Sequence, residues 1–276
     1  STSSTPTTAG SKATASGTTG AFTASITGLS PSTLYYVRAY AINSVGTSYG
    51  SQVTFTTSAQ KITFGEYLGA GSGTTKLLLH LNGSSTDSSG NGNNGTDKNI
   101  TYSLANGKFG QGAGFNGSSS VINVGYTAPT TDWTYSFWVN PTNFSAERAL
   151  IHNFLNTTSG RNIYIHFNAT TGAIDVDIPY IKDSVVTGTA PSTGVFSHIA
   201  VTRSGSAWKI YLNGNQVGSA TDSTSQESTT VCRIGKTNAS QAHLGSIDEV
   251  IVESRAWTAS EIKKYYTYSK GRFGIL

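Results

Sequence analysis

The sequence predicts an all-β protein. Residues that favour strands, chiefly Thr, Tyr, Val and Ile, recur throughout the 276 residues, while 31 glycines and many Asn and Ser residues favour turns. In several short segments, apolar and polar residues alternate one by one, which is the pattern of half-buried strands. The formal net charge is +4 and the basic residues are scattered, so a nucleic-acid partner is not expected. The longest aliphatic runs, such as residues 77–79, are far short of the ~20 apolar residues that cross a bilayer, so membrane insertion is not expected either.

The first 58 residues are expected to form a small separate part of the chain. Residues 1–20 are rich in Ser, Thr, Ala and Gly and have the composition of a linker. Apolar and polar residues alternate over 22–27, which predicts a half-buried strand that ends at the break over 28–31. Further strands are predicted over 34–42 and 52–57, with a turn at 43–46 between them.

This part resembles the last strands of a bacterial fibronectin type III-like domain. The resemblance lies in residues 28–50 and 53–57, where a Leu-x-Pro corner ending at Pro31 precedes a tyrosine-rich strand. Tyr35 or Tyr36 would be the corner tyrosine. Such a sandwich needs about seven strands and ~100 residues, so residues 1–58 are expected to be a partial domain. Its missing strands would come either from upstream in the same polypeptide or from another chain.

The larger part of the chain is expected to follow a linker at residues 59–75, which includes a Gly- and Ser-rich stretch. Regularly spaced short strands with turns between them are typical of a β-sandwich or jelly roll. Asn213 and Gly214 supply the two positive-φ residues of a tight hairpin. The strands are predicted at residues 133–139, 163–167, 174–178, 196–202, 208–212 and 247–252.

One short helix is predicted near the C-terminus. Thr258 and Glu261 have the spacing of a capping box, in which each side chain satisfies a backbone amide of the other residue. Ile262, Tyr265 and Tyr266 then recur at helical spacing. Because the helix is short, packing against the rest of the protein must stabilise it.

Residues 76–276 resemble the LamG-like, concanavalin A-like jelly-roll family. The resemblance implies two curved antiparallel sheets in an extracellular protein built for binding or adhesion. Each motif alone is only weakly specific for the family. Their occurrence in the family's order over most of this part makes the resemblance specific. The motifs follow one another at residues 77–95, 108–117, 133–141, 196–203, 209–217, 233–235, 244–250 and 257–262.

The resemblance also implies a structural calcium ion between the opening segment and the closing strand. Calcium prefers hard oxygen ligands. Asp87, in a loop rich in Gly, Asn and Ser, and Asp248, near the closing strand, would be ligands, with Asn82 as a weaker third. The alternative is that Asp87 caps an Asx-turn and Asp248 makes a buried hydrogen bond.

Catalysis is not expected. Related jelly rolls that cleave polysaccharides carry a Glu-x-Asp-x-x-Glu or Glu-x-Asp-x-Glu set on one strand, because glycoside hydrolysis uses two carboxylates. The nearest substitute here is Asp175 and Asp177, which share one face of a predicted strand without a third acid. The five histidines lack zinc-site spacing. Cys232 is expected to be a small buried apolar side chain.

Sugar binding would need exposed aromatic rings beside polar groups, because rings stack on sugar faces while polar side chains read the hydroxyls. Tyr164 and His166 share a strand face, Asp175 and Asp177 share another, and Tyr180 follows nearby. The alternative is that these are ordinary exposed strand residues. Three tryptophans lie in the family's core motifs and are expected to be buried: Trp133, Trp138 and Trp208.

Two functions from different classes follow. The first is an extracellular binding or adhesion module of a larger bacterial or phage surface protein, located at the cell or virion surface, with a glycan or a surface protein as partner. The second is a structural subunit of a fibre or phage appendage, assembled by contacts between neighbouring copies. If another copy supplied the strands missing from residues 1–58, the second would be favoured. A polysaccharide hydrolase is the least supported because the catalytic set is absent.

Overall fold

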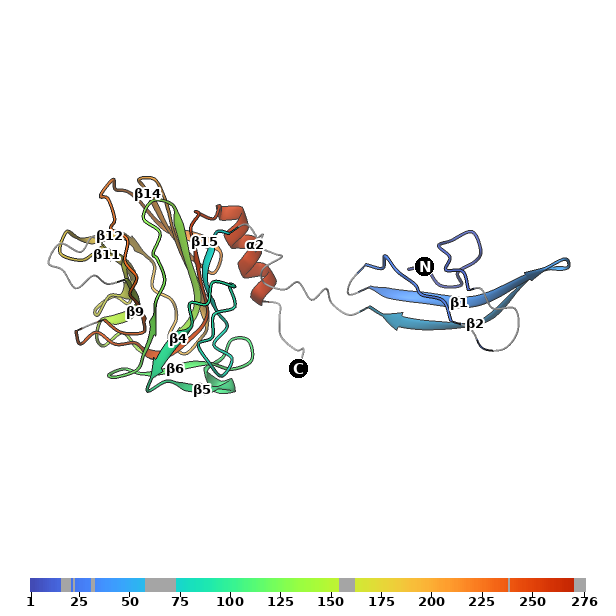
Figure 1. Cartoon of the computed structure of the whole chain (residues 1–276), viewed down its shortest axis with the longest axis horizontal. Helices are drawn as coiled ribbons and strands as arrows, with labels where there is room; N and C mark the ends of the chain where they lie inside the picture. Colours follow the sequence, from blue (N-terminus) through green and yellow to red (C-terminus); the bar gives the residue numbers. More distant parts are fainter. Residues whose placement is uncertain are drawn as a thin grey trace. The chain divides into compact units, whose positions relative to one another are not determined.

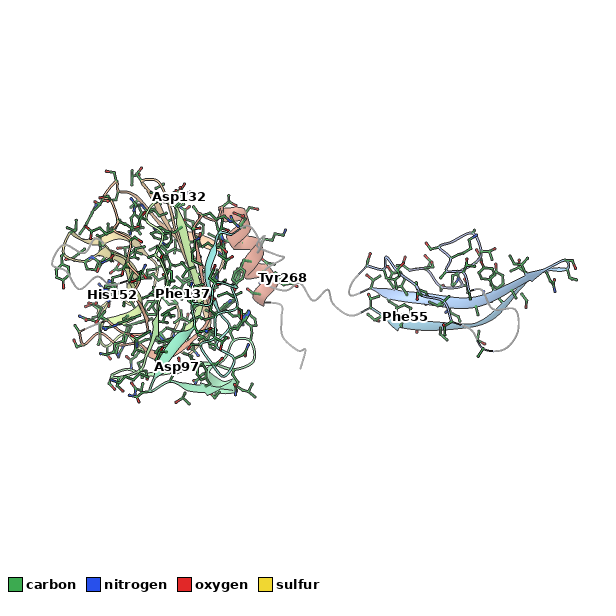
Figure 2. The ribbon with its side chains drawn as sticks, viewed as in Figure 1. Phe55, Asp97, Asp132, Phe137, His152 and Tyr268 are labelled. Carbon is green, nitrogen blue, oxygen red and sulfur yellow. The ribbon has the colours of Figure 1, made fainter. Side chains whose placement is uncertain are left out.

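A computed structural model describes residues 1–15, 21, 23–30, 33–57, 73–153, 162–237 and 239–270 of the chain. These residues belong to two compact units, Ser1–Leu68 and Gly69–Leu276. Antiparallel strands build both units (Figures 1 and 2), which confirms the predicted all-β class. Figure 2 labels Phe55 in the first unit and Phe137 inside the second.

The first unit contains a hairpin of β1 (Leu34–Asn43) and β2 (Gly46–Thr56). The backbone N–H of Ser30 donates to the hydroxyl of Tyr35 at 2.9 Å, a contact of the kind that a tyrosine corner makes. Of the two candidates, Tyr35 therefore fits that role. Its ring also stacks on Phe55 across the hairpin, with centroids 5.9 Å apart.

The predicted strand over 22–27 was wrong in the residues that are described there. Residues 23–27 are exposed and belong to no strand, because no neighbouring strand pairs with them. None of the described residues of the first unit is buried, so this unit has no core of its own among them. Its identity as part of a fibronectin-like sandwich therefore stays a prediction.

The second unit is a jelly roll of two antiparallel sheets. One sheet has seven strands in the order β12-β11-β10-β9-β16-β7-β4. Neighbours in this order come from distant parts of the sequence, so the sheet brings together side chains that the chain separates. Its strands are β4 (Gly95–Lys98), β7 (Val121–Val124), β9 (Arg148–Asn153), β10 (Tyr164–Phe167), β11 (Ile174–Ile178), β12 (Lys182–Gly188) and β16 (Cys232–Ile234).

The other sheet follows the order β15-β14-β13-β8-β17-β6-β5, and β3 also pairs with β17. The hairpin of β14 and β15 turns at Asn213 and Gly214, whose φ angles are +51° and +76°, as predicted. A short 3₁₀ helix, η1 (Leu104–Asn106), follows β5. The strands are β3 (Thr75–Leu79), β5 (Thr101–Ser103), β6 (Gly112–Asn116), β8 (Trp133–Pro141), β13 (Ser197–Ser204), β14 (Ala207–Leu212), β15 (Asn215–Thr221) and β17 (Leu244–Glu253).

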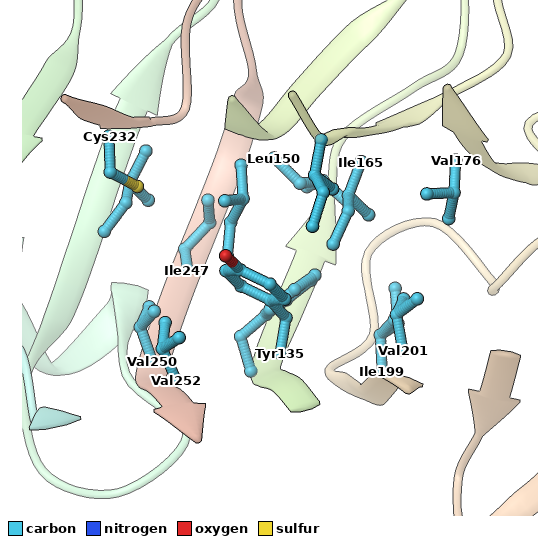
Figure 3. Packing of buried hydrophobic residues seen from close by; sticks show 14 of the residues in the cluster. Tyr135, Leu150, Ile165, Val176, Ile199, Val201, Cys232, Ile247, Val250 and Val252 are labelled. Atoms are coloured by element: carbon cyan, nitrogen blue, oxygen red, sulfur yellow. The ribbon is translucent and has the colours of Figure 1, made fainter. Parts of the chain in front are cut away.

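The core lies between the two sheets (Figure 3). Strand β8 contributes every second residue to it, including Trp133 and Tyr135, because successive side chains of a strand point to opposite faces. Ile165 and Val176 come from the facing sheet. Cys232 is 1% exposed within this core, and burial raises the pKa of its thiol to about 12, so the predicted role as a buried apolar side chain is confirmed.

Trp138 is buried as expected, but on the other face of β8. It lies beneath α2 (Ala259–Lys270), where its ring stacks on Tyr266 with centroids 5.8 Å apart. Its exposed fraction is 1%. Trp133 and Trp208 are the two predicted core tryptophans that lie between the sheets.

The predicted capping box is present at the start of α2. The backbone N–H of Glu261 donates to the Thr258 hydroxyl at 3.2 Å, and the N–H of Thr258 donates to the Glu261 carboxylate at 2.7 Å. Ile262 and Tyr265 are buried, so packing against the sheet stabilises the short helix. No helix within the described ranges has the length and apolar character required to cross a bilayer.

Candidate functional site

The strand register of the seven-stranded sheet brings together the residues considered for sugar binding. Tyr164 on β10 lies opposite Asp177 on β11, and His166 lies opposite Asp175. Directly opposed residues point to the same face of a sheet. Because Ile165 and Val176 face the core, these four side chains share the outer face.

The exposure that the alternating pattern predicted for these rings is not observed. Tyr164 is 6% exposed and His166 is 5% exposed. The two rings stack on each other, with centroids 4.3 Å apart and planes 11° apart, and His152 packs against Tyr164 at 5.2 Å. The Tyr164 hydroxyl donates to Glu147 at 2.7 Å. Because these rings stack on each other and are buried, neither ring presents an exposed face on which a sugar could stack.

His166 lies between two carboxylates. Its Nε2 is 3.0 Å from Oδ2 of Asp177, and its Nδ1 is 3.8 Å from Oε1 of Glu147. Burial alone would lower the pKa of His166, but the hydrogen bond and charge of Asp177, with Glu147 and Asp175 beyond it, outweigh burial and raise that pKa. The charged imidazolium form is therefore stabilised at this site.

The two aspartates of β11 have different partners. Asp177 also accepts the backbone N–H of Ser184 at 2.7 Å, so its carboxylate joins β10 to the start of β12. Asp175 accepts the side-chain amide of Asn168 at 3.2 Å, and its other oxygen is buried without a hydrogen-bond partner among the described residues. A buried Asp175 and an Asp177 bonded on both oxygens do not form an open pair of carboxylates.

Tyr180 differs from the other predicted sugar-binding residues because it is exposed. It lies in the Tyr180 turn, residues 178–181, where the N–H of Ile181 donates to the carbonyl of Ile178 at 3.0 Å. Pro179 and a φ of +67° at Tyr180 give this turn the features of type II. The Tyr180 side chain is 72% exposed, and Ile181 beside it is 49% exposed.

A positive φ is costly for a bulky residue. The left-handed conformation costs an L-residue about 1–2 kcal/mol, whereas glycine adopts it freely. The turn therefore holds an exposed aromatic ring at a position where glycine would fold more easily. Such an outlier is a reason to look for function at that residue.

Asp87 is one of the three predicted calcium ligands, and hydrogen bonds from the protein occupy the acceptor positions of its carboxylate. It accepts the N–H groups of Leu78, Ser89 and Asn93 and the hydroxyl of Ser89, at 2.8–3.0 Å. A carboxylate offers about four lone-pair directions, and these four donors use them. The arrangement fits the alternative interpretation of Asp87 as the cap of a turn.

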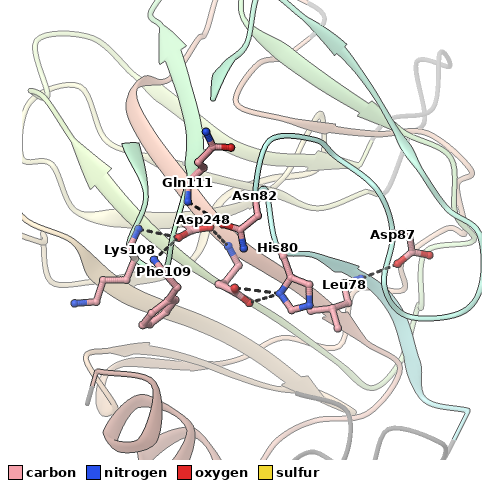
Figure 4. Close-up of polar contacts among 9 residues, drawn as sticks. Leu78, His80, Asn82, Asp87, Lys108, Phe109, Gln111 and Asp248 are labelled. Atoms are coloured by element: carbon pink, nitrogen blue, oxygen red, sulfur yellow. Dashed lines mark hydrogen bonds and ion pairs between the residues drawn. The ribbon is translucent and has the colours of Figure 1, made fainter. Parts of the chain in front are cut away.

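Asp248, on β17, and Asn82 both bond to the loop at residues 108–111, apart from Asp87 (Figure 4). Oδ2 of Asp248 accepts the N–H groups of Lys108 and Phe109 at 2.8 and 2.9 Å, while Oδ1 of Asn82 accepts the N–H of Gln111 at 2.8 Å. Burial, together with the charge of neighbouring Glu249, raises the pKa of Asp248 to about 8 despite these bonds.

Glu249 is buried, adopts a φ of +51°, and is bonded to Nδ1 of His80 at 2.9 and 3.1 Å. The polar side chains around Asp248 are therefore paired with other groups of the protein by hydrogen bonds.

These donors do not fit a calcium site that joins Asp87 to Asp248. Calcium takes six to eight oxygens, and the three predicted side chains already accept backbone donors. In the part of the chain that is described, no three His, Cys, Asp or Glu side chains form a group that could hold a metal ion. Calcium binding stays a prediction that this geometry does not support at Asp87.

Replacing Asp87 by alanine is expected to destabilise the protein by about 3 kcal/mol. The change removes four hydrogen bonds to a charged acceptor. Because all four donors belong to the protein, urea unfolding should give the same loss in EDTA as in calcium, and Asp87→Asn should lose less. A loss that appears in calcium and vanishes in EDTA would show instead that the carboxylate binds the ion.

The family and the fold have known relatives. Residues 116–263, a little over half of the chain, match the sequence model of the Concanavalin A-like lectin/glucanases superfamily. The chain belongs to this superfamily. No curated protein sequence matches it.

Three solved structures illustrate the shared fold. Domain 4 of AbnA, an extracellular arabinanase from Geobacillus stearothermophilus in complex with arabinotriose, has a TM-score of 0.56 and 21% identity, over 69% of this chain and 98% of that one.

The binding domain of Paraclostridial Mosquitocidal Protein 1 has a TM-score of 0.57 and 18% identity, over 71% and 52%. Botulinum neurotoxin type C, whose cell entry depends on two ganglioside molecules, has a TM-score of 0.58 and 12% identity, over 71% and 51%. At these identities the likeness establishes the fold.

Within this concanavalin A-like unit, sequence reasoning missed Glu147 and His152. Glu147 precedes β9 in a loop, so no periodicity marks it. His152 lies on β9, a strand that the sequence analysis did not predict. Both contact Tyr164. They do so because β9 pairs with β10, and only the strand order of the folded sheet reveals that pairing.

Proposed function

We propose that this chain is an extracellular glycan-binding module without catalytic activity, and that the Tyr180 turn contacts the glycan. The observation that carries the proposal is the exposed ring of Tyr180, 72% exposed at a φ of +67°. A sugar can stack on such a ring while nearby polar groups read its hydroxyls. Further support comes from the superfamily and from two fold neighbours, one solved in complex with arabinotriose and one whose cell entry depends on gangliosides.

The groups close to Tyr180 suit hydroxyl recognition. Asp177, three residues before it, keeps 15% of its side chain exposed. Carboxylates accept hydrogen bonds from hydroxyls. Lys182, two residues after Tyr180, pairs with Asp222 of the adjoining β15 end, which fixes the strand that follows the turn.

The change Tyr180→Gly is expected to weaken glycan binding about tenfold without lowering stability. The loss of an aromatic contact at a binding centre typically costs more than 1 kcal/mol, while glycine removes the strain of the positive φ. Retention on immobilised arabino-oligosaccharides and ganglioside glycans, together with thermal melting, measures both effects.

Tyr268→Ala, which removes another partly exposed tyrosine on α2, is the matched control and should bind as the wild type does. Equal binding by the Tyr180 variant would reject the turn as the site. Absence of binding by the wild-type chain across a broad glycan panel would reject the glycan proposal itself.

A structural role is the second candidate, and the exposed hairpin favours it. Val53 and Phe55 are 60% and 39% exposed on β2, a strand that carries no charged residue. Uncharged edge strands recruit strands from other chains. If copies associate here, Phe55→Lys in the full chain should shift sedimentation from an assembly to a monomer. A wild-type chain that is monomeric at high concentration would remove this candidate.

A further inference from the structure

The buried ion pair of His166 and Asp177 is connected to the exposed Tyr180 turn. Asp177 accepts from His166 with Oδ2 at 3.0 Å and from the N–H of Ser184 with Oδ1 at 2.7 Å. Residues 177 and 184 stand on either side of the Tyr180 turn, so this carboxylate clamps the base of the segment that carries the exposed ring. Ser184 itself has a φ of +51°, a conformation that needs support from its neighbours.

We propose that His166 is a positioning residue for the Tyr180 turn and makes its order depend on pH. When His166 is an imidazolium, it fixes the Asp177 carboxylate, and the carboxylate fixes Ser184 and the turn. When the ring loses its proton, its Nε2–H can still donate to the Asp177 carboxylate, but the ion pair is lost and the interaction weakens. The carboxylate then holds Ser184 less firmly and the turn becomes more mobile.

The surroundings of His166 support this assignment. Its ring is 5% exposed and stacks on Tyr164, so it cannot rotate freely to another partner. The raised pKa of His166 places the loss of its proton above the usual value near 6.5. The titratable and charged groups packed around it are Glu147, His152, Tyr164, Asp175 and Asp177, with Arg233 beyond His152. Arg148 on the neighbouring β9 is bonded to Ala242 and Asn143 instead.

Among these groups, His166 is the one expected to change charge near neutral pH. Burial, with the charge of Arg233, lowers the pKa of His152 to about 4, so His152 is already neutral at pH 6. Burial and Glu147 raise the pKa of Tyr164 far above that range. A change in the turn near neutral pH whose midpoint matches the titration of the His166 ring would therefore report on His166.

The test measures amide hydrogen exchange at Ser184 by NMR from pH 5.5 to 8.5, corrected for the intrinsic rate, beside the titration of the His166 ring. We expect the protection of Ser184 to fall about threefold to tenfold as pH rises, with the midpoint of the ring titration. The full wild-type chain alone decides the proposal, and a fall in protection with another midpoint, or no fall, would overturn it.

Two variants sharpen the test. Asp177→Asn keeps an acceptor for Ser184 but removes the charge, so it should move both midpoints to lower pH together. His152→Gln changes the other ring that packs on Tyr164 and should leave the midpoints in place. An unmoved midpoint in the Asp177 variant would overturn the proposal. Any effect on ligand binding rests on the proposed function, whereas the exchange measurement stands without a ligand.

Discussion

The protein is expected to lose about 3 kcal/mol of stability for each pH unit between roughly pH 6.5 and 4.5. Three histidines cause this loss because burial keeps them neutral in the folded state. Burial lowers the pKa of His152 to about 4 and that of His198 and His243 to about 3. In the unfolded chain each binds a proton below about 6.5, so acid favours unfolding by three protons.

Asp248 opposes this trend. Burial and Glu249 raise its folded pKa to about 8, so the folded state holds one proton that the unfolded state releases above about 4. The unfolded state therefore binds about two more protons than the folded state in this window, at about 1.4 kcal/mol per proton and pH unit. Stability present at neutral pH is lost as pH falls. It is also lost as pH rises through 8, so the maximum should lie near pH 6.5.

Urea unfolding at half-unit pH steps measures this dependence, and one variant assigns it. His243 is fully buried between Phe115 and Phe167, and burial lowers its pKa despite an interaction with the Ser246 backbone. His243→Phe should remove one proton from the difference and reduce the slope by about 1.4 kcal/mol per unit. The control Phe137→Leu, in the core between the sheets, should lower stability equally at every pH. An unchanged slope in His243→Phe would show that His243 is not protonated on unfolding.

The alternation of apolar residues predicted six of the fifteen strands described in the second unit, because one face of each of those six is buried. It could not predict what covers the opposite face. Tyr164 and His166 were expected to be exposed, and they are buried because Glu147 and His152, from residues before and within a neighbouring strand, pack around them. Contacts of this kind depend on strand order, which local patterns do not encode.

The backbone conformation of the Tyr180 turn could not be predicted from the sequence either. Pro179 marks a turn after β11, but nothing in the residue types around it says that Tyr180 adopts a positive φ, since glycine or asparagine is usual there. The predicted calcium ligands show the same limit. Asp248 and Asn82 bond to the same loop at residues 108–111, whereas Asp87 is bonded to Leu78, Ser89 and Asn93 instead.

Trp138→Ala is expected to cost about 3–5 kcal/mol and to release α2 from the sheet. Trp138 is covered on several sides, by Tyr266 at 5.8 Å, by Phe109 at 5.6 Å and by His198 at 5.4 Å between ring centroids. Lys108 also lies over the indole, at 4.8 Å from its centroid. Removing the indole leaves a cavity directly beneath the helix.

The matched control is Trp133→Ala, which should cost a similar amount because Trp133 is also fully buried, but between the two sheets. A helix of 12 residues is marginal without packing. Amide exchange in α2 should therefore speed up far more in the Trp138 variant than in the Trp133 variant, at equal global stability adjusted with urea. Equal exchange in the two variants would mean that Ile262, Tyr265 and the capping box hold the helix without the indole. A selective release would show that the outer face of β8 stabilises the C-terminal helix independently of the core.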